Sequence, residues 1–169
     1  MTIEDGRTHR TLFEQENYPL IPSRQQEIST VLKLLEKNPI VFVWGPAGNG
    51  KTGFGREFRN SSPVPTQLIL GGQLRSEEVQ TRLPFDQGIT DDSKIVIVDE
   101  VGIDDQTTLD KVIGHIKGGK SFVFLLHWPK SRWLNDRRYH KRHEEYMNRL
   151  INMFPDAPWM YLRKWRPKF

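Results

Sequence analysis

The chain contains no cysteine. A disulfide scaffold, a thiolate metal site and a cysteine nucleophile are therefore excluded. Long apolar runs are also lacking, because none approaches the roughly 20 residues that a membrane-spanning helix needs. Residues 1–10 are too polar for a secretory signal peptide. We therefore expect an intracellular protein, cytoplasmic or nuclear, with no membrane span.

The chain as a whole has little net charge, but its first two thirds are acidic and its last third is basic. The 169 residues carry a net charge of +4. Up to Asp110 there are 11 basic and 17 acidic residues, whereas from Lys111 onward there are 14 basic and 4 acidic residues. A basic C-terminal third favours an anionic partner, with nucleic acid as the first choice. The alternative is an ordinary solvated basic face.

Apolar periodicity predicts strands that alternate with helices. We expect an extended N-terminal segment over residues 1–22 and one domain over residues 23–169, whose last part, about 128–169, is basic and aromatic-rich. The alternation predicts an α/β fold of three layers, in which helices cover both faces of a mainly parallel, five-stranded sheet. The expected strands are Ile40–Trp44, Thr66–Leu70, Lys94–Val98, Ser121–Leu126 and Trp159–Leu162, and the expected helices are Ser23–Lys37, Lys51–Arg59, Arg75–Leu83, Thr107–Ile116 and Asp136–Phe154.

Two of these helices carry end signals. Ser23 is expected to cap the first helix, with Gln26 at the capping-box position. Gly118 and Gly119 are expected to end the helix that precedes the fourth strand.

A glycine-rich segment follows the first strand and matches the Walker A pattern Gly-x4-Gly-Lys-Ser/Thr. Its glycines allow the tight turn that brings backbone N–H groups onto phosphates, and the next helix directs its positive end at the same anion. Lys51 would reach the β- and γ-phosphates, and the Thr52 hydroxyl would ligate Mg²⁺. The predicted ATP-binding residues are Gly45, Pro46, Ala47, Gly48, Asn49, Gly50, Lys51 and Thr52.

The third expected strand ends in two carboxylates, as a Walker B strand does. Asp99 would hold Mg²⁺ together with Thr52, and Glu100 would act as general base for the attacking water. A solvated loop carboxylate is the alternative for Glu100. The adjacent pair favours the ATP-hydrolysing branch of P-loop proteins, in which an added strand lies between the two motif strands.

Beyond these motifs, residues 40–162 resemble the helicase domain of superfamily 3, the replication-initiator ATPases of small DNA viruses. The resemblance rests on the order of the motifs that follow Walker B: a Lys-Gly-Gly loop, a strand with a polar residue after it, a helix with an arginine, and a last strand. These are Ile116–Gly119, Ser121–Leu126 followed by His127, Asn148–Leu150 and Trp159–Leu162.

That resemblance implies roles for several of these residues. His127 stands where the family usually has asparagine and would contact the γ-phosphate or the attacking water. The alternative is a histidine that closes the strand and forms hydrogen bonds only with neighbouring groups. Arg149 would be an arginine finger that completes a neighbouring subunit's site, or would form a local helix pair. Lys117 and Lys120 would touch DNA, or would be ordinary turn lysines.

A second resemblance involves residues 18–28, which are similar to the segment before the nucleotide site in AAA+ and STAND ATPases. There the segment helps to hold the adenine. Those proteins carry a helical lid after the fifth strand, for which the present chain has no room before Phe169.

Basic and aromatic residues also gather after His127. Lysine and arginine neutralise phosphates, and tryptophan stacks on exposed bases; a solvated helix face is the alternative. The nucleic-acid candidates here are Lys130, Arg132, Trp133, Arg137 and Arg138, in addition to Lys117 and Lys120.

Together these motifs predict a Mg²⁺-dependent ATPase that forms a homo-oligomer and couples hydrolysis to single-stranded DNA or RNA, as a helicase or packaging motor does. The alternative is a nucleotide-dependent regulatory switch that acts on a protein partner.

Overall fold

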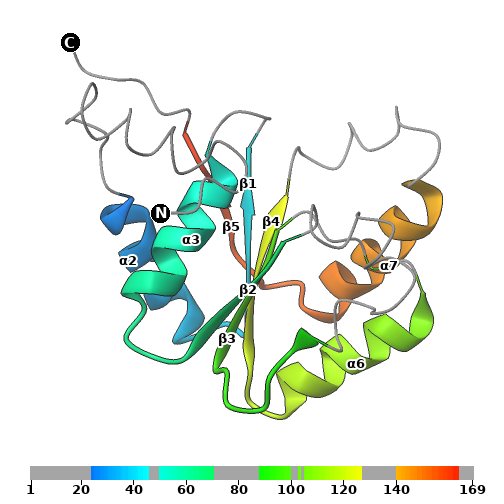
Figure 1. The fold of residues 1–169 in the computed structure, drawn as a ribbon. Coiled ribbons are helices and arrows are strands. Elements are labelled where there is room, and N and C mark those ends of the chain that lie inside the picture. The colour runs from blue at the N-terminus through cyan, green and yellow to red at the C-terminus, as the bar shows by residue number, and fades with distance from the viewer. Residues whose placement is uncertain are drawn as a thin grey trace, which may run out of the picture.

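The computed structural model describes residues 24–45, 50–70, 88–99, 103, 105–126 and 140–163. No helix in these ranges is both long enough and apolar enough to cross a bilayer. Along the chain (Figure 1), the elements are α2 (Gln25–Leu35), β1 (Ile40–Trp44), α3 (Lys51–Ser61), β2 (Thr66–Leu70), β3 (Ile95–Asp99), α6 (Gln106–Lys117), β4 (Ser121–Leu126), α7 (His140–Met153) and β5 (Trp159–Tyr161).

The five strands form one sheet in the order β2-β3-β4-β1-β5. All four neighbouring pairs are parallel, so the expected parallel sheet is confirmed. Strand β4 lies between β1 and β3, the two strands that carry the Walker motifs. The predicted insertion of a strand between the motif strands is therefore also confirmed.

Helices cover both faces of this sheet, which confirms the three layers. Figure 1 shows α2 and α3 on one side and α6 and α7 on the other. Alternate residues of β1 enter different cores. Phe42 belongs to the cluster that contains Leu109 and Met147, whereas Val43 belongs to the cluster that contains Ile28 and Phe54. Because β1 is buried on both faces, its sequence is continuously apolar rather than alternating.

The start of α2 differs from the prediction. Arg24 occupies the N-cap position, so the expected cap at Ser23, which lies outside the described residues, is misplaced. The carboxylate of Glu57 on α3 holds this end of the helix instead. Its Oε2 accepts a hydrogen bond from the Arg24 backbone N–H at 3.1 Å, and its Oε1 accepts one from Gln25 Nε2 at 3.1 Å. The start of α2 is thus held by a tertiary contact that no local pattern encodes.

The other differences are small. Strand β3 begins one residue later than expected and includes Asp99, and α6 extends one residue further at each end than expected. Asp105 caps α6, because its side chain accepts a hydrogen bond from the Thr108 N–H at 2.7 Å. The predicted glycine end of α6 is confirmed, with Gly119 at φ +101°. The helix expected over residues 75–83 lies outside the described residues.

Helix α3 lies close against the sheet at Gly55. A Cβ atom there would lie 3.1 Å from Leu68 Cδ1 and 3.1 Å from Leu125 Cδ1, so a branched side chain has no room. We expect Gly55→Val to lower the free energy of unfolding by about 1–3 kcal/mol, because it overpacks this contact. Urea unfolding followed by circular dichroism measures the change.

Gly53 provides the matched control on the same helix. A Cβ atom at this exposed position meets nothing within 4 Å. Gly53→Ala should therefore raise the free energy of unfolding by about 0.5–1 kcal/mol through helix propensity alone. Equal effects of the two substitutions would contradict the close approach at Gly55.

Candidate nucleotide-binding site

Those predicted Walker residues that the structure describes lie at the edge of the sheet where the parallel strands end. Strand β1 leads into Gly45, β3 ends at Asp99, and α3 begins at Lys51. Ligands of open α/β sheets bind outside this carboxyl edge. The described part of the loop consists of its two ends, Gly45 and Gly50, because residues 46–49 lie outside the described ranges.

Gly50 makes the turn into α3. It adopts the left-handed conformation, with φ +78° and ψ +30°, at the N-cap position. Its carbonyl accepts the first backbone hydrogen bond of the helix from the Phe54 N–H at 2.8 Å. A residue with a Cβ atom is strained in this conformation, which explains the glycine of the motif. The helix therefore begins directly at Lys51 and directs its positive end toward the loop.

Lys51 is buried, with 5% of its surface exposed. Its Nζ donates a hydrogen bond to the Gly45 carbonyl at 2.9 Å. A buried ammonium group needs oxygen acceptors, and Gly45, the first residue of the glycine-rich segment, supplies one. Phosphate oxygens bound in that loop are acceptors of the same kind and carry negative charge, which makes them stronger partners.

Thr52 and Asp99 join the two Walker motifs directly. The Thr52 hydroxyl donates a hydrogen bond to Asp99 Oδ2 at 2.6 Å, although 47 residues separate them in sequence. Asp99 is 5% exposed. A hydroxyl and a carboxylate are hard oxygen donors, which Mg²⁺ prefers, and Mg²⁺ takes only one or two such protein ligands beside phosphates and water. The donor set present therefore fits the predicted metal.

Arg24 is a further residue next to the loop. Its guanidinium Nη2 donates to the Arg163 carbonyl at 2.9 Å, and its Nη1 pairs with Glu27 at 3.1 Å. The Nη2 atom also lies 4.0 Å from where a Cβ atom would stand on Gly50. Arg24 thus connects the start of α2 with the chain that follows β5, and its guanidinium lies near Gly50. The resemblance over residues 18–28 indicated this neighbourhood without indicating the arginine's contacts.

Lys120 lies at the opposite edge of the sheet, where its side chain forms hydrogen bonds to backbone carbonyls. Its Nζ donates to the carbonyls of Thr90 at 2.9 Å and Asp91 at 3.1 Å, and also to the carbonyl of Ser93. This geometry favours the alternative interpretation, a lysine that holds a turn, over the predicted DNA contact. Lys117 is exposed at the end of α6.

Arg149 is exposed on α7, with 48% of its side chain accessible. It forms an ion pair with Glu145 at 3.0 Å, donates a hydrogen bond to Gln106 on α6 and lies over the Tyr146 ring at 5.2 Å. These contacts are the local helix pairing that was the alternative to an arginine finger.

The remaining predicted site residues are not described. They comprise the middle of the phosphate loop, the predicted base, the predicted sensor and the basic residues after it. These are Pro46, Ala47, Gly48, Asn49, Glu100, His127, Lys130, Arg132, Trp133, Arg137 and Arg138.

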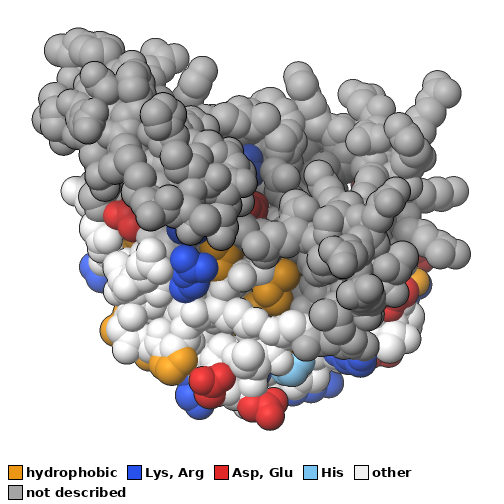
Figure 2. All heavy atoms as spheres, viewed as in Figure 1, with side chains coloured by type: hydrophobic (Ala, Val, Ile, Leu, Met, Phe, Trp, Pro, Cys, Tyr) orange, Lys and Arg blue, Asp and Glu red, His pale blue; other side chains and the backbone are white. Residues whose placement is uncertain are grey.

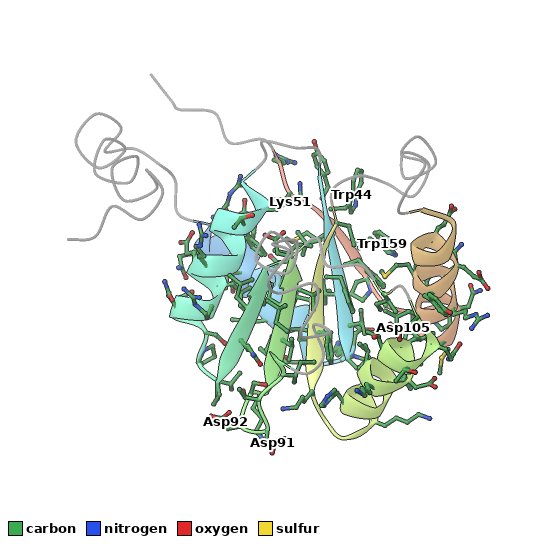
Figure 3. All side chains as sticks on the ribbon, turned by 45° about the vertical axis from the view of Figure 1, so that its right-hand side comes forward. Trp44, Lys51, Asp91, Asp92, Asp105 and Trp159 are labelled. Atoms are coloured by element: carbon green, nitrogen blue, oxygen red, sulfur yellow. The ribbon has the colours of Figure 1, made fainter. Side chains whose placement is uncertain are left out.

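The described surface carries charges of both signs. Figure 2 shows acidic and basic side chains interspersed along the lower part of the molecule, the edge opposite the nucleotide site. Figure 3 shows Asp91 and Asp92 at this edge and Lys51 at the other. A mixed surface of this kind does not attract a polyanion strongly, so the described lower edge gives no support for nucleic-acid binding there.

Comparison with known proteins gives structural matches only. No family model matches the chain, and no curated protein matches it. The fold is similar to the crystal structure of a protein from Streptococcus pyogenes serotype M3 described as a candidate primosome component, with a TM-score of 0.55, 15% identity, and coverage of 86% of this chain and 82% of that one. Domain III of the Thermotoga maritima replication initiation protein DnaA matches with a TM-score of 0.48, 16% identity, and coverage of 88% of this chain and 65% of that structure. At these identities the likeness concerns the fold.

Proposed function

We propose that this chain is a Mg²⁺-dependent ATPase of the AAA+-like P-loop class that couples hydrolysis to single-stranded nucleic acid. The observation that carries the proposal is the hydrogen bond between Thr52 and Asp99, with Lys51 buried beside them. These side chains meet because α3 begins at the edge of the sheet where β3 ends, and β4 separates the two motif strands. Nucleotide hydrolysis uses this combination of a phosphate cradle and a metal-binding carboxylate.

The residues divide the chemistry among them. Lys51 would move from the Gly45 carbonyl to the β- and γ-phosphate oxygens of ATP and stabilise their charge. Thr52 and Asp99 would hold Mg²⁺, which supplies further charge neutralisation when bound. Glu100 would accept the proton of the water that attacks the γ-phosphorus, while the bond to the β-phosphate oxygen breaks and ADP leaves. His127 would orient that water or the γ-phosphate.

Nucleic-acid coupling is proposed from charge and fold. Residues 111–169 carry the basic excess of the chain, and the fold is shared with a candidate primosome component. A homo-oligomer in which one subunit's arginine completes the next subunit's site belongs to this proposal. Arg149 is the first candidate for that arginine although it pairs locally with Glu145. Arg132 and Arg138, from the basic stretch after His127, are further candidates for the same role.

A regulatory switch is the second candidate, and Arg24 is the observation that favours it. This side chain joins α2 to the chain after β5, and its guanidinium lies near Gly50 at the end of the glycine segment. A change in the loop on nucleotide binding would therefore reach both neighbouring segments without hydrolysis being needed. The switch hypothesis predicts slow ATP hydrolysis at a rate that does not change when nucleic acid is added.

One experiment distinguishes the two candidates. Phosphate release is measured with ATP and Mg²⁺, with and without a single-stranded oligonucleotide, and mass is measured in the Glu100→Gln variant, which should bind ATP without hydrolysing it. The proposal expects turnover to rise several-fold with oligonucleotide and the ATP-bound variant to assemble. Turnover that does not respond to any oligonucleotide, together with tight ATP binding, would favour the switch.

A further inference from the structure

The edge strand β5 carries an aromatic row from the core to the surface. Trp159 pairs with Phe42 on β1, and Tyr161 pairs with Trp44. The rings of Phe42 and Trp159 are stacked, with centroids 4.5 Å apart and planes 22° apart. Those of Trp44 and Tyr161 lie 4.7 Å apart at 53°. Phe42 is fully buried, whereas Trp159 is 41% and Tyr161 is 45% exposed.

This exposure is unusual for side chains of this size. The described residues include four exposed large hydrophobic side chains, and the two aromatic ones, Trp159 and Tyr161, are neighbours on the same side of one strand. Ring contacts with β1 hold both side chains in place, so that little conformational entropy remains to be lost on binding a flat apolar group. The row is therefore a preformed surface for stacking.

Basic residues follow the aromatic pair directly. Arg163 is exposed two residues after Tyr161, and residues 157–169 contain Arg163, Lys164, Arg166 and Lys168 with no acidic residue. Asp156 precedes β5 and so lies at the other end of the strand. Single-stranded nucleic acid is recognised by this combination, because aromatic rings stack on bases while basic side chains neutralise phosphates.

The surface is connected to the nucleotide site through β1. Trp44 directly precedes Gly45, whose carbonyl accepts the Lys51 hydrogen bond. The Leu162 N–H donates to the Trp44 carbonyl at 2.9 Å, which fixes the end of β5 against this position. Figure 3 shows Trp44 and Trp159 on the same side of the sheet, toward α7, with Lys51 on the other side of β1.

We propose that Trp159 and Tyr161, with Arg163 after them, form a base-stacking platform for single-stranded nucleic acid, here called the β5 platform. This inference rests on the proposed nucleic-acid coupling and gives that coupling a place on the molecule. Bases that stack on β5 would contact the strand that leads into the phosphate loop, which provides a short path from nucleic acid to the ATP site.

Fluorescence anisotropy at fixed salt tests the platform. The probe is a labelled deoxythymidine oligonucleotide of about 15 nucleotides, a length that spans one binding surface. Tyr161→Ala should weaken binding about tenfold, because a base loses its stacking partner. Tyr161→Phe keeps the ring and should stay within about twofold of the parent chain. Met153→Ala is the matched control, because Met153 is 49% exposed but not aromatic. Basal ATP turnover without oligonucleotide should be the same in all three variants.

Photocrosslinking provides a test that needs no substitution. An oligonucleotide with 5-iododeoxyuridine is irradiated with the full chain and digested with trypsin, which cuts after Arg149 and Arg163. The platform expects cross-links within residues 150–163, at Trp159 or Tyr161. This measurement also replaces a Trp159 variant, which would disturb the buried stack on Phe42.

The outcomes separate this inference from the proposed function. Oligonucleotide binding that persists in Tyr161→Ala, with cross-links only in other peptides, would overturn the platform and leave nucleic-acid coupling intact. ATP hydrolysis without any oligonucleotide binding would overturn both the platform and the coupling, and would leave the ATPase. A changed mass rather than a changed affinity in Tyr161→Ala would assign the surface to self-association and overturn the platform.

Discussion

Lys51→Ala should lower ATP turnover by at least about 100-fold, since it removes a preorganised positive charge from the phosphate site. The lysine is buried, and its Nζ donates a hydrogen bond to the Gly45 carbonyl at 2.9 Å. No reorganisation of distant elements is then needed to place its charge on the phosphates. Phosphate release at saturating ATP and Mg²⁺ measures the loss.

Lys37→Ala is the matched control for charge. Lys37 is an exposed lysine just after α2, and its removal changes the net charge by the same amount. Its turnover should stay within about twofold of the parent chain, as expected for a surface charge. Thermal unfolding of both variants separates lost chemistry from lost folding. Normal turnover in a folded Lys51→Ala chain would exclude the proposed phosphate role.

Asp99→Asn should reduce turnover to a similar extent, about 100-fold, and should raise the Mg²⁺ concentration needed for half of the remaining activity. Asparagine keeps the shape of the side chain and can still accept the Thr52 hydrogen bond, so the fold should persist. Only the negative charge that attracts the metal is lost. A Mg²⁺ titration of phosphate release measures the shift.

The same substitution at the other end of β3 is the control. Asp92 is exposed in the turn before the strand, at the edge opposite the nucleotide site, as Figure 3 shows. Asp92→Asn should leave both turnover and the Mg²⁺ requirement unchanged. An unaltered Mg²⁺ requirement in Asp99→Asn would mean that Asp99 supports the fold rather than the metal.

Several features of the site could be predicted from sequence because their causes are local. The Walker A pattern places a glycine directly before its lysine, and Gly50 adopts the left-handed conformation at the start of α3. The apolar run before it is buried on both faces, as its composition predicts. The carboxylate at Asp99 closes the next apolar strand in the Walker order.

Other features could not be predicted, because they depend on which groups meet across the fold. The cap expected at Ser23 was misplaced, since Glu57 on another helix supplies the contacts that hold the start of α2. Lys120 directly follows the Lys-Gly-Gly motif and was therefore predicted to contact DNA. In the structure its ammonium group donates to three backbone carbonyls of the loop before β3. A charge in a sequence does not show which acceptors will lie near it.

The sequence alone determined the alternation of strands and helices and predicted the Walker segments, because glycine conformations and apolar periodicity act within a few residues. Only the tertiary structure decided that Thr52 and Asp99 lie 2.6 Å apart and that β5 ends the sheet with two aromatic rings exposed. Strand order and solvent exposure arise from packing between segments far apart in the chain. The local sequence pattern does not indicate which strand will lie at the edge of the sheet.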